Sequence, residues 1–213
     1  CRVGGEKYGD YNTHVRGSFA FSDVADGGLI NHEYPNTITS FDKAIGNCPM
    51  PVISHETAQF QTYPDYHEIK KYTGVLYPYN MEVFRARLQK AGMLSQATDF
   101  HQASGLWSVQ LYKADIEMDL RTRNMAGFHL LDLQDYPGQG SAYVGILDAF
   151  MQTKGITTPE EFRQWCSPVV PLLNAKGYTY YNGEQISLNI QIANYSEQSL
   201  QDKSMSWRIT SED

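Results

Sequence analysis

A short apolar run that ends in polar residues, at positions 51–56 (PVISHE), constrains the fold more than any other part of the chain. Val52 and Ile53 are typical of a strand buried on both faces, as in a parallel sheet covered by helices. Polar residues directly after such a strand indicate that the chain is leaving the interior for a cleft. Barrel enzymes carry their chemistry at this end of their strands. Glu56 is therefore the leading candidate for a catalytic residue.

Strand and helix patterns alternate after this run, which favours parallel β/α units. The evidence is the spacing of apolar residues, the capping residues and the turns between the segments. The expected elements are a helix over residues 80–90, a helical pattern over 95–121 with a break at Gly105, a strand over 126–133, a helix over 143–153, and a helix that starts at the capping box of residues 158–161 (TPEE). A further strand is expected over residues 14–22. The fold class predicted for residues 1–170 is α/β, as part of a (β/α)8 barrel.

The pattern changes past Pro171. Residues 178–181 and 184–193 are predicted as strands joined by a tight turn at Asn182 and Gly183, because apolar and polar residues alternate along the second of them. The same alternation returns over residues 205–209. Residues 171–213 are therefore expected to begin a separate β-sandwich domain.

Composition limits the partners of the chain. The 213 residues are 41% hydrophobic and 19% charged, which suits a globular protein with a real core. A net charge of −7 without a cluster of Lys or Arg argues against nucleic acid and against an anionic membrane surface. Aromatic residues make up 13% of the chain and suit stacking on sugar rings, although they suit a plain core as well.

The sequence predicts neither a metal site nor a cofactor. Three widely spaced cysteines form neither a disulfide framework nor a zinc pattern. His55, His67 and His101 lack the spacing of zinc ligands. The chain starts with Cys1 rather than Met, so we expect it to be a piece of a longer protein, whose redox compartment stays open.

Two segments resemble glycoside hydrolase family 2. Residues 51–56 are similar to the nucleophile strand of that family, and residues 126–135 (AGFHLLDLQD) are similar to its final barrel strand. The region from Tyr178 resembles the start of the immunoglobulin-like domain that follows the barrel in β-galactosidases and β-glucuronidases. One departure is that Leu131 and Leu133 stand where tryptophans are common in the family. The resemblance covers most of residues 14–195.

The resemblance implies a retaining exo-acting glycosidase that cleaves β-glycosidic bonds, with Glu56 as its nucleophile. It places the acid/base on an earlier strand, upstream of Cys1, since Glu33 lies in a loop only 23 positions before Glu56. His55 is expected to orient Glu56 or contact substrate, or else to bond to backbone. Candidate substrate-binding residues at the exit of the second strand are Asp132, Gln134 and Asp135; the alternative role for the two aspartates is to cap the following turn.

Other readings of the sequence remain open. A non-catalytic carbohydrate-binding or scaffold barrel is the main alternative, and an α/β hydrolase is disfavoured because no Gly-x-Ser-x-Gly elbow is present. The resemblance implies a bacterial periplasmic or secreted setting, while the sugar and its linkage are not specified. We expect the truncated barrel to be inactive on its own and to self-associate through uncovered strand edges.

Overall fold

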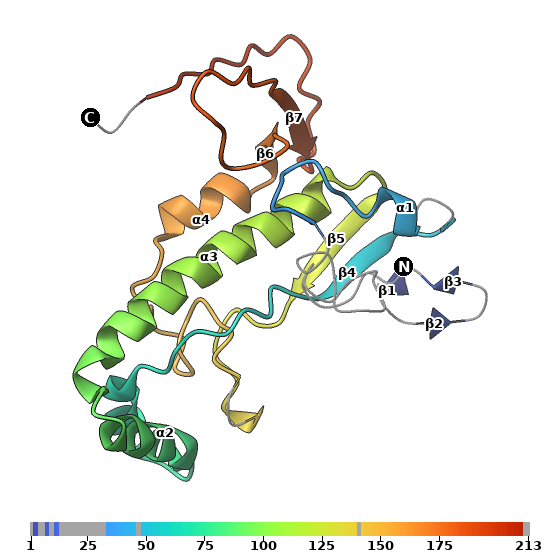
Figure 1. The fold of residues 1–213 in the computed structure, drawn as a ribbon. Helices are drawn as coiled ribbons and strands as arrows, with labels where there is room; N and C mark the ends of the chain where they lie inside the picture. The colour runs from blue at the N-terminus through green and yellow to red at the C-terminus, as the bar shows by residue number, and fades with distance from the viewer. Residues whose placement is uncertain are drawn as a thin grey trace.

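The structure, a computed structural model, describes residues 2–3, 7–8, 11–12, 33–45, 48–139 and 142–210. It is a mixed α/β arrangement with small sheets, and Figure 1 shows how its elements lie in space. The main sheet has the parallel order β1-β4-β5, formed by Arg2–Val3, Val52–Thr57 and Met125–Leu130. A small antiparallel pair joins β2 (Lys7–Tyr8) to β3 (Tyr11–Asn12), and the short helix α1 (Asp42–Ile45) precedes β4. The strand predicted over residues 14–22 lies outside the described residues.

A β/α unit links β4 to β5, as the sequence predicts. Between the two strands lie the 3₁₀ helix η2 (Tyr66–Lys71), α2 (Tyr79–Lys90), the single turn η3 (Leu94–Gln96) and α3 (Ala97–Arg121). The long helix α3 runs beside the sheet (Figure 1). Its buried side chains Val109, Tyr112 and Ile116 form the main core with residues from the loops after β4 and β5 and from α4. Each such apolar side chain contributes about 1.5–3 kcal/mol when fully buried.

The break predicted at Gly105 is wrong, because α3 continues through this position. Gly105 is buried against Ile156, and a Cβ atom at this position would overlap the Cγ2 atom of Ile156. The glycine therefore provides room for close packing and does not end the helix.

The helix predicted over residues 143–153 is also wrong. This segment is extended, and Leu147 forms isolated bridges with Gln134 and with Thr153. Tyr143, Val144, Gly145 and Ile146 are buried in succession, which a helix with one apolar face would not allow. Asp148 then holds the turn, since its Oδ1 accepts hydrogen bonds from the backbone N–H groups of Phe150 and Gln152.

Helix α4 (Pro159–Trp165) forms where the capping box predicts it. The Thr158 hydroxyl accepts from the Glu161 N–H at 3.2 Å, and the Glu161 carboxylate accepts from the Thr158 N–H at 2.9 Å. Pro159 occupies the first turn, where a missing N–H costs nothing.

The carboxy-terminal part differs from the prediction in its strands. An antiparallel pair joins β6 (Val169–Asn174), which the sequence did not predict, to β7 (Asn189–Asn194), the end of the strand expected over 184–193. Residues 178–181 and 205–209 are not strands. The turn at Asn182 and Gly183 does form, with Gly183 at φ +86° and the Glu184 N–H donating to the Tyr181 carbonyl.

The β6–β7 pair rests on the end of α3 by one face. Val170, Leu172 and Ala193 form a small buried cluster that packs against Leu120. Pro171 interrupted the apolar run in the sequence, but it is tolerated because a two-stranded sheet consists of edge strands. Among the described helices, none combines the length and the apolar character that crossing a membrane requires.

Candidate functional site

The candidate site lies at the carboxyl-terminal ends of the parallel strands β4 and β5, which lie side by side. Glu56 is the penultimate residue of β4 and is half-buried. Its backbone has φ +57°, and the pairing of β4 with β5 shifts register between Ser54 and Thr57. A positive φ is uncommon for a residue other than glycine, and irregular pairing at a strand end changes the direction of a side chain. Gln59 donates its Nε2 to Glu56 Oε2 at 3.1 Å.

Two interactions hold the chain just beyond Glu56. Ala58 is fully buried at φ +68°, and its N–H donates to Asp115 Oδ2 of α3 at 2.8 Å. The Thr57 carbonyl accepts from the Leu131 N–H at 2.9 Å, which ties the exit of β4 to the exit of β5. The unusual backbone on either side of Thr57 is therefore fixed by the surrounding structure.

Asp132 and Gln134 follow β5 at the same edge of the sheet. Both side chains are half-buried, and Asp132 Oδ1 accepts from the Leu133 N–H at 2.6 Å. The Asp132 carbonyl accepts from the Tyr112 hydroxyl at 2.7 Å. The Leu131–Asp132 peptide bond is cis. Gln134 forms a backbone bridge with Leu147.

Asp135 points into the interior and forms a buried ion pair. Lys154 Nζ lies 2.7 Å from Asp135 Oδ1, and the two side chains are 2% and 4% exposed. Lys154 also donates to Thr62 Oγ1 and to the Gly145 carbonyl, while the Gly145 N–H donates to Asp135. Burial raises the pKa of Asp135, and the Lys154 ammonium opposes this shift. These bonds assign Asp135 to the support of the loop after β5.

Glu68 of η2 lies close to this ion pair. Only 3% of Glu68 is exposed, and its Oε2 atom has no hydrogen-bond partner among the described residues. Burial, together with the carboxylates of Asp135 and Asp148, raises the pKa of Glu68 to about 7. The neighbouring Lys71 pairs with Asp148.

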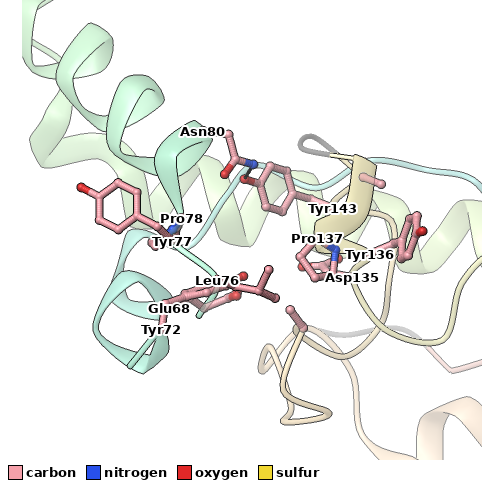
Figure 2. A pocket seen from close by; sticks show the side chains of 12 residues that line it. Glu68, Tyr72, Leu76, Tyr77, Pro78, Asn80, Asp135, Tyr136, Pro137 and Tyr143 are labelled. Atoms are coloured by element: carbon pink, nitrogen blue, oxygen red, sulfur yellow. Dashed lines mark hydrogen bonds between the residues drawn. The ribbon is translucent and has the colours of Figure 1, made fainter. Parts of the chain in front are cut away.

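Glu68 lines a cavity of about 50 Å³ between η2, the start of α2 and the loop after β5 (Figure 2). Asn80 donates its Nδ2 to the Tyr143 hydroxyl at 2.6 Å across the upper wall. The wall residues are Glu68, Tyr72, Leu76, Tyr77, Pro78, Asn80, Asp135, Tyr136, Pro137, Ala142, Tyr143 and Ala149.

Two sequence candidates, His55 and Glu33, remain to be located. His55 belongs to β4, but its side chain is outside what the structure describes. Glu33 is exposed and accepts a hydrogen bond from Thr39 at 2.9 Å within its own loop. No group of three His, Cys, Asp or Glu side chains that could hold a metal ion is found in the described ranges.

Sequence reasoning missed Glu68, Lys154 and Asn80. One local signal existed for Glu68, because Asp65 caps the 3₁₀ turn that carries it, accepting from the His67 N–H at 3.0 Å. Lys154 could not be found in this way, since it approaches Asp135 only through the extended path of residues 142–153.

Neither the known protein-family models nor the curated proteins include a match to this chain. The assignment of a function therefore depends on the two segments at the ends of β4 and β5 and on their geometry.

Proposed function

We propose that this chain is part of a retaining, exo-acting glycoside hydrolase that cleaves β-glycosidic bonds, similar to β-galactosidases, with Glu56 as nucleophile. The observation that carries the proposal is the backbone at the end of β4. Glu56 stands there at φ +57° beside a register shift, next to the end of the parallel strand β5. Such backbone is found at functional sites, where the surrounding structure holds an uncommon conformation in place.

The chemistry requires two carboxyl groups. The Glu56 carboxylate attacks the anomeric carbon while a protonated carboxylic acid, about 5–5.5 Å away, gives its proton to the leaving oxygen. The glycosidic bond breaks and an ester between Glu56 and the sugar forms. Water then attacks this ester, the second residue takes the proton of the water, and Glu56 is released. We place the second carboxyl group on an earlier barrel strand, as the resemblance implies.

The described residues supply parts of this mechanism around Glu56. The Gln59 amide donates to Glu56 and orients its carboxylate. Asp132 and Gln134 follow β5 at the same edge and are candidates for binding sugar hydroxyls, because carboxylate and amide groups bond to hydroxyls in pairs. Asp135 supports their loop through Lys154.

The sheet is consistent with part of a (β/α)8 barrel. β1, β4 and β5 are parallel neighbours, and β5 has no partner on its second side among the described strands. A barrel of about eight strands would supply that partner and would close the sheet. Under this proposal the chain alone is inactive, because the described residues supply three parallel strands of a barrel of about eight and no assigned acid/base.

The test is covalent trapping in the full-length protein. 2-Deoxy-2-fluoro aryl glycosides of several sugars form a long-lived ester with a retaining nucleophile, and peptide mapping by mass spectrometry locates it. We expect the label on Glu56 and its loss in Glu56→Gln, while the matched variant Glu33→Gln still labels. A label on another carboxylate would move the nucleophile elsewhere.

The alternative is a barrel that binds carbohydrate without catalysis. This alternative gains support if the full-length protein binds sugars but neither hydrolyses these glycosides nor becomes covalently labelled by any of them. Hydrolysis that survives Glu56→Gln would contradict both the nucleophile and this alternative.

A further inference from the structure

We propose that the cavity lined by Glu68 is an accessory subsite that binds the hydroxyl-bearing edge of a neutral sugar unit, beyond the bond that Glu56 is proposed to cleave. This inference rests on the proposed function for its choice of carbohydrate, although the cavity is separate from Glu56. Four observations support it: an unpartnered buried oxygen, the size of the cavity, its aromatic walls and its balance of charge.

The unpartnered oxygen is Glu68 Oε2. Glu68 is only 3% exposed, and its Oε2 atom has no hydrogen-bond partner among the described residues. Leaving a buried polar group unsatisfied costs about 1–3 kcal/mol, so buried acceptors nearly always have partners. Since Glu68 lines the cavity, a donor within the cavity would satisfy it.

The cavity has the size of a sugar edge. About 50 Å³ are available, and one water needs roughly 10–15 Å³ on this measure, so about three to five waters fit. This is too little for a whole pyranose ring but enough for the hydroxyl groups along one side of it. The rest of the ring would lie at the mouth of the cavity, over the rim.

The walls of the cavity include the rings of Tyr72, Tyr143 and Pro137 (Figure 2). Tyr77 and Tyr136 also line the cavity, but their rings point away from it on opposite sides (Figure 2). The Tyr136 ring packs on Gly138, where an added Cβ would lie 2.7 Å from Tyr136 Cζ. Flat apolar faces combined with a few convergent polar groups are the features that bind small polar molecules such as sugars.

The charges favour a neutral ligand over an acidic one. Lys154 is paired with Asp135 and Lys71 with Asp148, so each ammonium already has its own carboxylate. Glu68 is a third carboxyl group without an ammonium of its own. A uronate would bring a further negative charge next to it, whereas a hydroxyl can donate to Glu68 in either protonation state.

The position suits a chain of sugars. The cavity is built from segments that follow β4 and β5, the two strands whose ends carry Glu56 and Asp132 (Figure 1). An oligosaccharide held at the end of β4 would have to extend as far as the start of α2 to reach the cavity.

The structure offers a matched pair of variants for the test. Val75 and Leu76 are neighbours and both exposed, at 102% and 64%, but only Leu76 lines the cavity, and its side chain points into it (Figure 2). In the full-length protein carrying Glu56→Gln, to prevent turnover, binding of lactose, cellobiose and β-1,4-galactobiose is measured by calorimetry, with an aldobiouronic acid as the acidic counterpart. We expect Leu76→Ala to weaken binding of at least one neutral disaccharide about three- to tenfold and Val75→Ala to leave it unchanged. Glu68→Gln should reduce the discrimination against the aldobiouronic acid.

Three results would overturn the inference: no saturable binding of any neutral disaccharide, equal losses in the Leu76→Ala and Val75→Ala variants, or an aldobiouronic acid that binds as tightly as the neutral sugars. The outcome is distinct from that of the trapping experiment. A label on Glu56 without a Leu76 effect removes the subsite and keeps the glycosidase, while a Leu76 effect without any label keeps the subsite and removes the nucleophile.

Discussion

The buried ion pair of Lys154 and Asp135 is the most consequential single contact near the site. Its side chains are 2% and 4% exposed, so neither charge is solvated if the other is lost. Removing one partner of a buried pair costs about 3–5 kcal/mol. We therefore expect Lys154→Met to lower the free energy of unfolding by about that amount, as measured by urea denaturation.

The control for this prediction is the exposed Lys176, whose replacement by Met should change stability by less than about 0.5 kcal/mol. Adding Asp135→Leu to Lys154→Met should recover part of the loss, because it removes the unpaired charge. A Lys154→Met variant as stable as Lys176→Met would show that the pair does not hold the loop.

Asp119 of α3 gives a prediction about pH. It is buried, and burial together with the charge of Asp115 raises its pKa well above the usual 3.8. The folded state therefore binds a proton that the unfolded state releases, so the contribution of Asp119 to stability falls as pH rises above about 3.8. We expect Asp119→Asn to raise the free energy of unfolding relative to the parent, and to raise it more at pH 7 than at pH 4. Urea titrations of both proteins at both pH values would measure this difference.

The exposed Glu197 supplies the comparison, since Glu197→Gln should leave the pH profile of stability unchanged. If Asp119→Asn has the same profile as the parent, Asp119 is ionised in the folded protein and another group compensates its charge.

At this scale the sequence could predict the position of Glu56 but not the partners of Asp135 and Glu68. An apolar run followed by polar residues is a local pattern, and β4 forms where that pattern predicts it. The contact of Asp135 with Lys154 depends on how two loops run past each other. No local pattern carries that information, and so a residue predicted to bind substrate has a structural ion pair.

The packing of α3 against the loop before α4 depends on one glycine. An added Cβ at Gly105 would overlap Ile156 Cγ2, and Ile156 is 5% exposed within the core. We expect Gly105→Ala to lower the free energy of unfolding by about 1–3 kcal/mol, although alanine is the better helix former by about 1 kcal/mol. Thermal or urea unfolding would measure this loss.

A double-mutant cycle separates the clash from the helix propensity. In an Ile156→Ala background the space is free, so Gly105→Ala should become neutral or stabilising by up to about 1 kcal/mol. If Gly105→Ala costs the same in both backgrounds, the contact with Ile156 is not the reason for the glycine.

Elements with strong local signals were predictable, whereas elements defined by distant contacts were not. The capping box of α4 and the long apolar period of α3 both lead to helices. Residues 143–153 have a comparable apolar content, but their bridges to Gln134 and Thr153 and the close approach of Gly145 to the Gln134 backbone hold them extended. The sequence did not predict β6 because Pro171 lies within it, and proline is tolerated only in an edge strand of a sheet.

On the scale of the whole molecule, the described sheets are small and their apolar faces are only partly covered. The inner face of the β6–β7 pair packs on α3, while its outer face carries exposed side chains. Those exposed apolar residues are Val169, Leu173, Ile190 and Ile192, with Ile186 and Leu188 nearby in the chain. Contiguous exposed apolar patches of this kind are typical of surfaces that another sheet or chain covers.

We therefore expect the chain produced alone to self-associate, and light scattering after size-exclusion chromatography would measure it. The matched variant places opposite charges on one cross-strand pair of the outer face, Leu173→Glu with Ile190→Lys, because these residues are register partners. Opposite charges across the strands keep the pair together while the apolar face is lost. The variant should therefore associate less, and the concentration at which it associates should rise about tenfold. A parent chain that stays monomeric at about 100 µM, where contacts of micromolar affinity would be populated, would contradict the prediction and would mean that this face is stable in water without a cover.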